Sequence, residues 1–177
     1  IIITSQAGLY RYDINDVVRV TGLFRNTPLM EFVRKGRDMV SLTGEKLHVT
    51  QLIQAVERAQ LSVGLNVAYF RAVGNVEDCR YDLKLELAQD HVSDESVVSL
   101  GRAIDEELSK LNIEYEQKRR SARLHAPHVH VMARGWSTKR REAKIARAAR
   151  DTQFKDALLG LRDEDDLPAD ILKDLST

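Results

Sequence analysis

A short polar joint at residues 34–38, Arg-Lys-Gly-Arg-Asp, constrains the fold more than any other feature, because it separates two stretches of different character. Residues 1–33 have the β-branched content of short strands, but they carry too few apolar side chains to bury a core of their own. Residues 39–177 mix helical and strand patterns, which is typical of an α+β helix and sheet sandwich. We therefore predict a terminal β segment of a larger lobe at 1–33, a hinge at 34–38 and a mobile carboxy-terminal lobe at 39–177.

Local patterns place the elements on each side of this joint. Ser93 is the predicted N-cap of the strongest helix, Thr50 caps an earlier one, and Gly64 follows the end of that earlier helix. Strands are predicted at 1–4, 16–24, 29–33, 66–73, 81–87 and 128–132, and helices at 50–60, 94–111, 138–150 and 168–175.

Composition limits the class of protein. With 177 residues, the chain can form one compact core and a small appendage. Cys79 is the only cysteine, which indicates a reducing, cytoplasmic setting. No apolar run approaches the roughly 20 residues that a membrane helix needs, so we expect no membrane partner. The chain begins at Ile1 in the middle of an apparent strand, and we expect it to be the carboxy-terminal piece of a longer enzyme.

Two motifs carry possible chemistry. Residues 8–18 read GLYRYDINDVV, in which Asp16 closes a turn, and residues 36–47 read GRDMVSLTGEKL, in which a Gly-Glu-Lys turn precedes a helix. A carboxylate such as Asp16 can accept hydrogen bonds from both hydroxyls of a ribose. The alternative is that Asp16 only caps a turn, as aspartate commonly does.

Residues 4–47, TSQAGLYRYDINDVVRVTGLFRNTPLMEFVRKGRDMVSLTGEKL, resemble the Gretchen-Hagen-type auxin-responsive acyl-acid amido synthetases, a branch of the adenylate-forming superfamily. The resemblance covers residues 4 to about 60 without gaps and is diffuse beyond residue 61. It implies a ligase that uses ATP and Mg²⁺ to convert a carboxylic acid into an acyl-adenylate. An amine, such as that of an amino acid, would then accept the acyl group. The same superfamily includes coenzyme A ligases, so a thiol acceptor remains open.

The resemblance also implies roles for individual residues. Asp16 falls on the ribose-binding aspartate, and Tyr10 and Arg11 fall on the residues that frame it. Arg34 matches the basic residue at the joint between the lobes, and Lys46 matches a lysine before the helix. Lys155, in a Gln-Phe-Lys segment, resembles a catalytic lysine that swings in to neutralise phosphate charge.

The chain departs from the family pattern in ways that affect these roles. Asn15 stands where the family has a glycine before the aspartate, and asparagine tolerates a left-handed backbone. The Ser/Thr/Gly-rich phosphate loop of the family is missing from these residues. We therefore predict that this chain is inactive alone and that its acid and amine substrates bind mainly through a missing amino-terminal lobe.

Three histidines form a candidate metal motif. His125, His128 and His130 give an H-x-x-H-x-H pattern, and imidazole is a preferred zinc ligand. No cysteine or acidic residue lies nearby in the sequence to complete a ligand set. The sequence therefore favours surface histidines and predicts no metal site.

A basic helix supplies the alternative function. Lys118 to Lys155 contain twelve Lys or Arg and two acidic residues, and helical spacing puts Arg140, Lys144 and Arg147 on one face. This face would suit a noncatalytic module that binds nucleic acid or an acidic partner. A solvated helix that packs through Ala143, Ile145 and its neighbouring alanines explains the pattern too, with Trp136 as its anchor. We expect nucleic acid not to be a partner, because an acidic segment follows at 163–166.

Overall fold

The computed structural model describes residues 1–14, 16–35, 39–147, 157–161 and 170–177. The chain divides into two compact units, Ile1–Asp38 and Met39–Thr177, which are described separately. The division falls between Asp38 and Met39, at the end of the predicted joint. Arg34 and Lys35 of that joint belong to a strand, and residues 36–38 lie outside the described residues. The hinge itself stays a prediction.

The first unit consists of two separate strand pairs. The short strands β1 (Ile2–Ile3) and β2 (Tyr12–Asp13) pair antiparallel, as do the longer strands β3 (Asp16–Phe24) and β4 (Thr27–Lys35). The β3–β4 pair is a hairpin with two irregularities in its register. None of the described side chains of this unit is buried. The unit therefore has strands without a core of its own.

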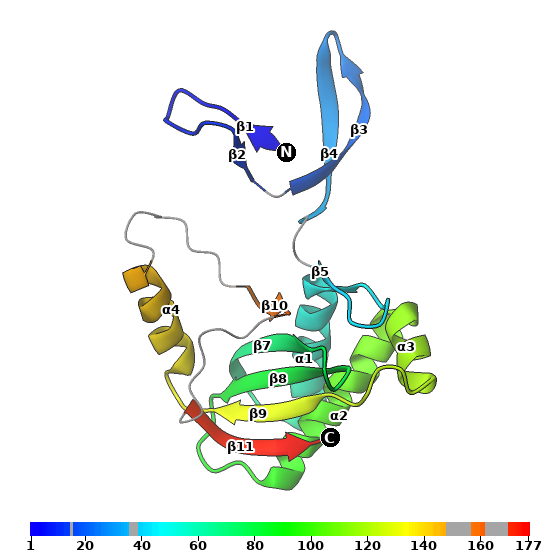
Figure 1. Cartoon of the computed structure of the whole chain (residues 1–177), viewed down its shortest axis with the longest axis vertical. Helices are drawn as coiled ribbons and strands as arrows, with labels where there is room; N and C mark the ends of the chain where they lie inside the picture. The colour runs from blue at the N-terminus through cyan, green and yellow to red at the C-terminus, as the bar shows by residue number, and fades with distance from the viewer. Residues whose placement is uncertain (15, 36–38, 148–156, 162–169) are drawn as a thin grey trace. The chain divides into compact units, whose positions relative to one another are not determined.

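The second unit is built on a five-stranded mixed sheet in the order β10-β7-β8-β9-β11 (Figure 1). The neighbours β7 and β8 are antiparallel, β8 and β9 are parallel, and β9 and β11 are antiparallel. A separate short pair, β5 and β6, precedes the first helix. The strands of this unit are β5 (Met39–Val40), β6 (Leu47–His48), β7 (Val67–Asn75), β8 (Arg80–Leu87), β9 (His128–Met132), β10 (Leu159–Gly160) and β11 (Ile171–Ser176).

Two helices cover one face of this sheet and bury the core. The first, α1 (Val49–Val63), ends at Gly64, whose φ of 75° lets its N–H bond the carbonyl of Gln60. The second, α2 (Asp94–Leu111), begins at Ser93, whose side chain accepts a hydrogen bond from Ser96 N as predicted. The core between helices and sheet is apolar: Leu52, Ala55, Val56, Ala59, Leu83, Leu85, Val97, Leu100, Ile104, Leu108 and Val129.

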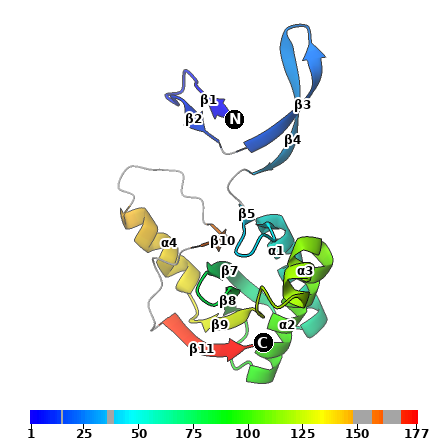
Figure 2. The same ribbon diagram turned by 45° about the vertical axis from the view of Figure 1, so that its right-hand side comes forward.

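Two further helices flank the unit. The short helix α3 (Ile113–Arg120) was not predicted, and it is fixed to α2 by Arg119, which makes a bidentate ion pair with Asp105. The last helix, α4 (Trp136–Arg147), lies across the sheet from α1 and α2 (Figure 2). The α+β fold class is thus confirmed, and helices lie on both faces of the sheet.

Two local predictions were wrong. The helix predicted at 168–175 is instead the edge strand β11, because pairing with the free edge of β9 satisfies its backbone groups. Helix α1 begins one residue before Thr50, and its N-cap is His48, whose N–H donates to Gln51 Oε1 at 3.1 Å. A side chain three residues into the helix therefore replaces the expected hydroxyl cap.

Candidate functional site

The loop at residues 41–46 of the second unit is built around one buried carboxylate. Glu45 has no exposed surface, and it accepts hydrogen bonds from Leu42 N and Thr43 N, both at 2.8 Å. The Thr43 hydroxyl donates to it at 3.0 Å, and the Tyr81 hydroxyl of β8 donates to its other oxygen. Four donors thus fold the loop around this side chain.

The same hydrogen bonds set the ionisation of Glu45. Burial is the largest effect and opposes ionisation, but the hydrogen bonds from Leu42, Tyr81 and Thr43 together lower the pKa of Glu45 below its ordinary value. Burial, and then the hydrogen bond to Glu45, raise the pKa of Tyr81 well above its ordinary value. Tyr81 is therefore a proton donor and Glu45 an anion whose acceptor sites are filled, so we assign this pair to loop structure.

This loop presents Lys46 to solvent. Gly44 turns the chain at a φ of 105°, and Lys46 itself has a left-handed φ of 45°. The Asn112 side chain donates to the Glu45 carbonyl at 2.9 Å, which fixes the backbone just before Lys46. The Lys46 ammonium lies 3.4 Å from Glu114 in an exposed ion pair. Such pairs stabilise little, so an anionic ligand can compete for this ammonium.

The turn predicted to hold ribose lies in the first unit. Backbone hydrogen bonds from Ser5 N to Leu9 O and from Gly8 N to Ser5 O close the turn, and Arg11 N donates to Thr4 Oγ1. The Tyr10 side chain is 79% exposed, and Arg11 is exposed as well. Both therefore offer free surface a few residues before Asp16.

Asp16 is half-buried at the first position of β3. The hairpin register pairs Val17 with Arg34 and Asp16 with Lys35. Arg34 therefore lies next to Asp16 in the strand ladder although the two are 18 positions apart. The first unit thus contains four of the six predicted site residues: Tyr10, Arg11, Asp16 and Arg34. Lys46 belongs to the second unit, and Lys155 lies outside the described residues.

Helix α4 differs from the predicted basic helix. Arg140 is only 4% exposed, whereas Ile145 is 56% exposed and Ala143 and Ala146 also face solvent. The helix is oriented by Trp136, which is buried as predicted and packs edge-on against Tyr69 at 5.5 Å between ring centroids. Glu86 accepts hydrogen bonds from Gly135 N and Ser137 N at its start. The predicted cationic face with Arg140 as an exposed member is therefore wrong, as is the predicted packing face.

The three histidines do not form one cluster. His125 Nδ1 lies 2.8 Å from the Asp78 carbonyl, whereas His128 and His130 meet Asp174 of β11. Burial is the main cause that lowers the pKa of His130. The acidic partner was missed because it is 44 positions away in a segment predicted to be helical. Residues 171–176 read ILKDLS, which does not alternate between apolar and polar residues, so the sequence carries no clear strand signal there.

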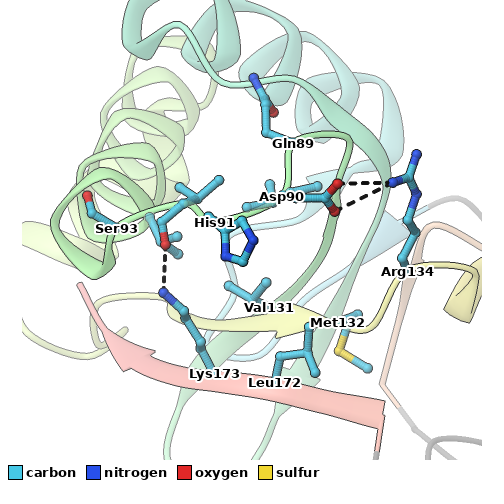
Figure 3. Close-up of a pocket in the computed structure, with 12 residues that line it drawn as sticks. Gln89, Asp90, His91, Ser93, Val131, Met132, Arg134, Leu172 and Lys173 are labelled. Carbon is cyan, nitrogen blue, oxygen red and sulfur yellow. Dashed lines mark hydrogen bonds and ion pairs between the residues drawn. The ribbon is translucent and has the colours of Figure 1, made fainter.

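A separate cavity of about 680 Å³ opens beside the loop between β8 and α2. Figure 3 shows its rim, where Arg134 lies 3.3 Å from Asp90 and Lys173 donates to the Val92 carbonyl at 2.7 Å. Lys173 also donates to the carboxylate of Asp94. Its floor is apolar, with Val97, Val131, Met132 and Leu172. The cavity has the size of a small-molecule site, but each of these two cations is already neutralised by a carboxylate. Among the described residues that line it, none is a predicted site residue.

Comparison with protein families separates the same two regions. The GH3 family C-terminal domain matches residues 50–159, and the GH3 family central domain matches residues 1–35. The boundary between these matches lies between residues 35 and 50, where the two units also divide.

Individual relatives agree with this assignment. The chain is 27% identical over 162 residues to indole-3-acetic acid-amido synthetase GH3.3 of Arabidopsis thaliana, which covers 88% of this chain and 27% of that protein. It is 38% identical over 72 residues to 4-substituted benzoates-glutamate ligase GH3.12 of the same plant, which covers 39% of this chain and 12% of that protein.

A solved structure shows the same fold. The GH3.15 acyl acid amido synthetase matches with a TM-score of 0.74 at 21% identity, over 99% of this chain and 33% of that protein. A second GH3.15 structure, in complex with 2,4-DB, matches with a TM-score of 0.70. The chain therefore spans about a third or less of the length of these proteins. The part of the chain that the structure describes contains no helix long and apolar enough to cross a membrane.

Proposed function

This chain belongs to the GH3 family, and we propose that it supplies the ribose-binding turn and the carboxy-terminal lobe of an ATP-dependent acyl acid amido synthetase. The observation that supports this proposal best is the register of the β3–β4 hairpin. It places Arg34, at the end of the first unit, beside the strand that begins at Asp16. Asp16, the proposed ribose contact, and Arg34, at the predicted joint, thus lie on two strands of one hairpin.

The reaction has two steps. In the first, a carboxylate oxygen of the acid attacks the α-phosphorus of ATP, which forms an acyl-adenylate and releases pyrophosphate. In the second, an amine nitrogen attacks the acyl carbon, the bond to AMP breaks, and the nitrogen loses a proton. The printed names of two relatives, an indole-3-acetic acid-amido synthetase and a benzoates-glutamate ligase, support an acid and an amino acid as the substrate classes. Mg²⁺ would accompany ATP as the counter-ion of its phosphates, and we assign it no ligand in this chain.

The described residues suit charge roles in the first step. The carboxylate of Asp16 can accept hydrogen bonds from the ribose hydroxyls, while Tyr10 and Arg11 have exposed side chains that can pack beside the nucleotide. Lys46 makes an exposed ion pair with Glu114, and such pairs are weak enough for an anionic ligand to compete for its ammonium. Lys155 is proposed as the lysine that neutralises developing phosphate charge, on the resemblance alone. A cytoplasmic location is likewise proposed from the single cysteine.

Replacement of Asp16 in the full-length enzyme tests the proposal. We expect Asp16→Ala to raise the KM for ATP by about tenfold or more, because a hydrogen bond to a charged group contributes roughly 1.5–3 kcal/mol. The measurement is acid-dependent exchange of labelled pyrophosphate into ATP. Asp13→Ala, at a nearby acidic residue without an assigned role, is the matched control. An unchanged ATP dependence in Asp16→Ala would refute the assignment.

A further inference from the structure

Three potential metal ligands meet at one edge of the five-stranded sheet. His128 and His130 are two positions apart on β9, so their side chains lie on the same face. The antiparallel register puts Asp174 of β11 directly opposite His130. One ligand atom from each of the three residues lies within 4.8 Å of the other two. The ladder of β9 and β11 thus assembles the group from backbone pairing.

The two imidazole rings converge on the same carboxylate oxygen. His128 Nε2 contacts Asp174 Oδ1, and His130 Nδ1 lies 3.5 Å from that atom. The other nitrogen of His128, Nδ1, lies 3.4 Å from the Ser176 hydroxyl oxygen, which can accept its proton. In that tautomer the lone pair of Nε2 faces the carboxylate, and the two repel unless a positive charge lies between them. A single proton can bridge only one imidazole nitrogen and the carboxylate, whereas a metal ion can bind both imidazole nitrogens and the carboxylate at once.

We propose that His128, His130 and Asp174 form a binding site for a divalent first-row transition metal ion, with Zn²⁺ as the best fit. Two imidazole nitrogens and one carboxylate oxygen are ligands that zinc accepts, whereas Mg²⁺ and Ca²⁺ favour oxygen ligands. The Asp174 side chain is 62% exposed, which leaves a fourth position open to water. The Ser176 hydroxyl lies within hydrogen-bond distance of Nδ1 of His128, the ring nitrogen that would not bind the metal. Zinc-bound histidines usually have such an outer-sphere partner.

The neighbours on β8 leave the local charge balanced. Asp82 pairs in register with His128, and Lys84 pairs with His130. Arg80 is engaged by Asp82 at 3.0 Å and by Asp78 at 3.0 Å, so its charge is matched by carboxylates. The positive charge of a bound ion would therefore be balanced mainly by the carboxylate of Asp174. The ion would also join β11 to β9 through side chains as well as backbone, independently of the proposed ligase chemistry.

Metal titration of the tag-free, chelator-treated 177-residue chain tests this site. We expect Zn²⁺ to bind with one ion per chain in calorimetry, and Co²⁺ to give visible absorption bands of a four-coordinate site. Asp174→Asn and His130→Gln should each weaken Zn²⁺ binding by at least tenfold, and Ser176→Ala by about 10-fold or more, as for other second-sphere partners. His125→Ala is the matched control, since His125 lies outside the cluster, and it should bind Zn²⁺ as the unchanged chain does.

A folding defect in the variants would be distinguished by a second measurement. X-ray absorption of the zinc-loaded chain should show two imidazoles and nitrogen or oxygen neighbours at about 2.0–2.1 Å. Equal Zn²⁺ affinity in the unchanged chain and Asp174→Asn would overturn the proposal, as would a zinc spectrum without two imidazoles. Only millimolar binding by the unchanged chain would overturn it as well.

Discussion

The two units use β-strands in opposite ways. In Ile1–Asp38, strands pair two by two and leave large apolar side chains in solvent, with Leu23 69% and Phe24 64% exposed. In Met39–Thr177, strands of similar composition join one sheet whose apolar face is sealed by α1 and α2. Backbone pairing alone gives a hairpin, whereas a stable unit also needs a second layer to bury its apolar face. The first unit therefore leaves apolar surface that its own described residues do not bury.

Separation of the two units gives the largest expected effect. We expect residues 39–177 to unfold cooperatively, at nearly the same midpoint urea concentration as the whole chain. Residues 1–38 alone should show no cooperative transition. The reason is that isolated two-stranded hairpins are marginal in water. Circular dichroism during urea unfolding measures both. A cooperative transition in the 1–38 peptide would show that the first unit has a core of its own.

A matched pair of leucine substitutions measures the difference in burial between the two units. Leu100→Ala, in the core of the second unit, should cost about 2–5 kcal/mol of unfolding free energy, because it opens a cavity. Leu23→Ala, in the exposed hairpin, removes the same atoms and should stay within about 0.5 kcal/mol. Urea denaturation of the 177-residue chain gives both values. Equal costs for the two substitutions would contradict the assigned difference in burial.

The loop around Glu45 predicts a pH effect confined to the second unit. Because the folded pKa of Glu45 lies below its ordinary value of 4.5, the ionised carboxylate stabilises the fold above that value. This stabilisation is lost as pH falls through the folded pKa. Glu45→Gln should therefore lower the unfolding free energy at pH 7 by about 1–3 kcal/mol. The difference in unfolding free energy between the variant and the unchanged chain should become smaller as the pH falls. Glu57→Gln, at an exposed position of α1, is the control and should change neither.

The smallest expected signal concerns ATP. The chain carries the proposed ribose turn and exposed cations, but its sequence contains no Ser/Thr/Gly-rich phosphate loop, so we expect the 177-residue chain to bind ATP weakly or undetectably. Isothermal titration calorimetry is the measurement, with the full-length enzyme for comparison. One-to-one binding at micromolar affinity would mean that the nucleotide site is complete within these residues.

The elements that sequence predicted well are those whose pattern is local. Helix α2 has an apolar stripe and a Ser93 cap, and both are properties of neighbouring residues. Strand β11 was missed because its structure comes from the edge of β9, which lies some 40 positions earlier. The orientation of α4 was missed for a similar reason. Contacts with Tyr69 and Glu86 on the sheet determine which face of α4 is buried, and the pattern of arginines and alanines along the helix does not.

The candidate sites follow the same rule. Tyr10, Arg11 and Asp16 are close in sequence, so one motif indicates all three. The partner of the two histidines and the buried acid of the 41–46 loop were not identified, because cross-strand and loop contacts decide their roles. Residues that act through distant contacts give no local signal. For Lys155, outside the described residues, the assigned role remains a prediction.

The strand order of the sheet sets the sequence in which this unit can fold. Strands β7 and β8 are joined by a short turn, but both edges of the sheet, β10 and β11, come from the last twenty residues of the chain. Edge pairing must therefore wait for long loops to close, which slows folding. Until then β7 and β9 present unpaired backbone groups on both sides, which other chains can bind. During synthesis, the time before these late residues emerge is thus the period in which this domain is most open to aggregation.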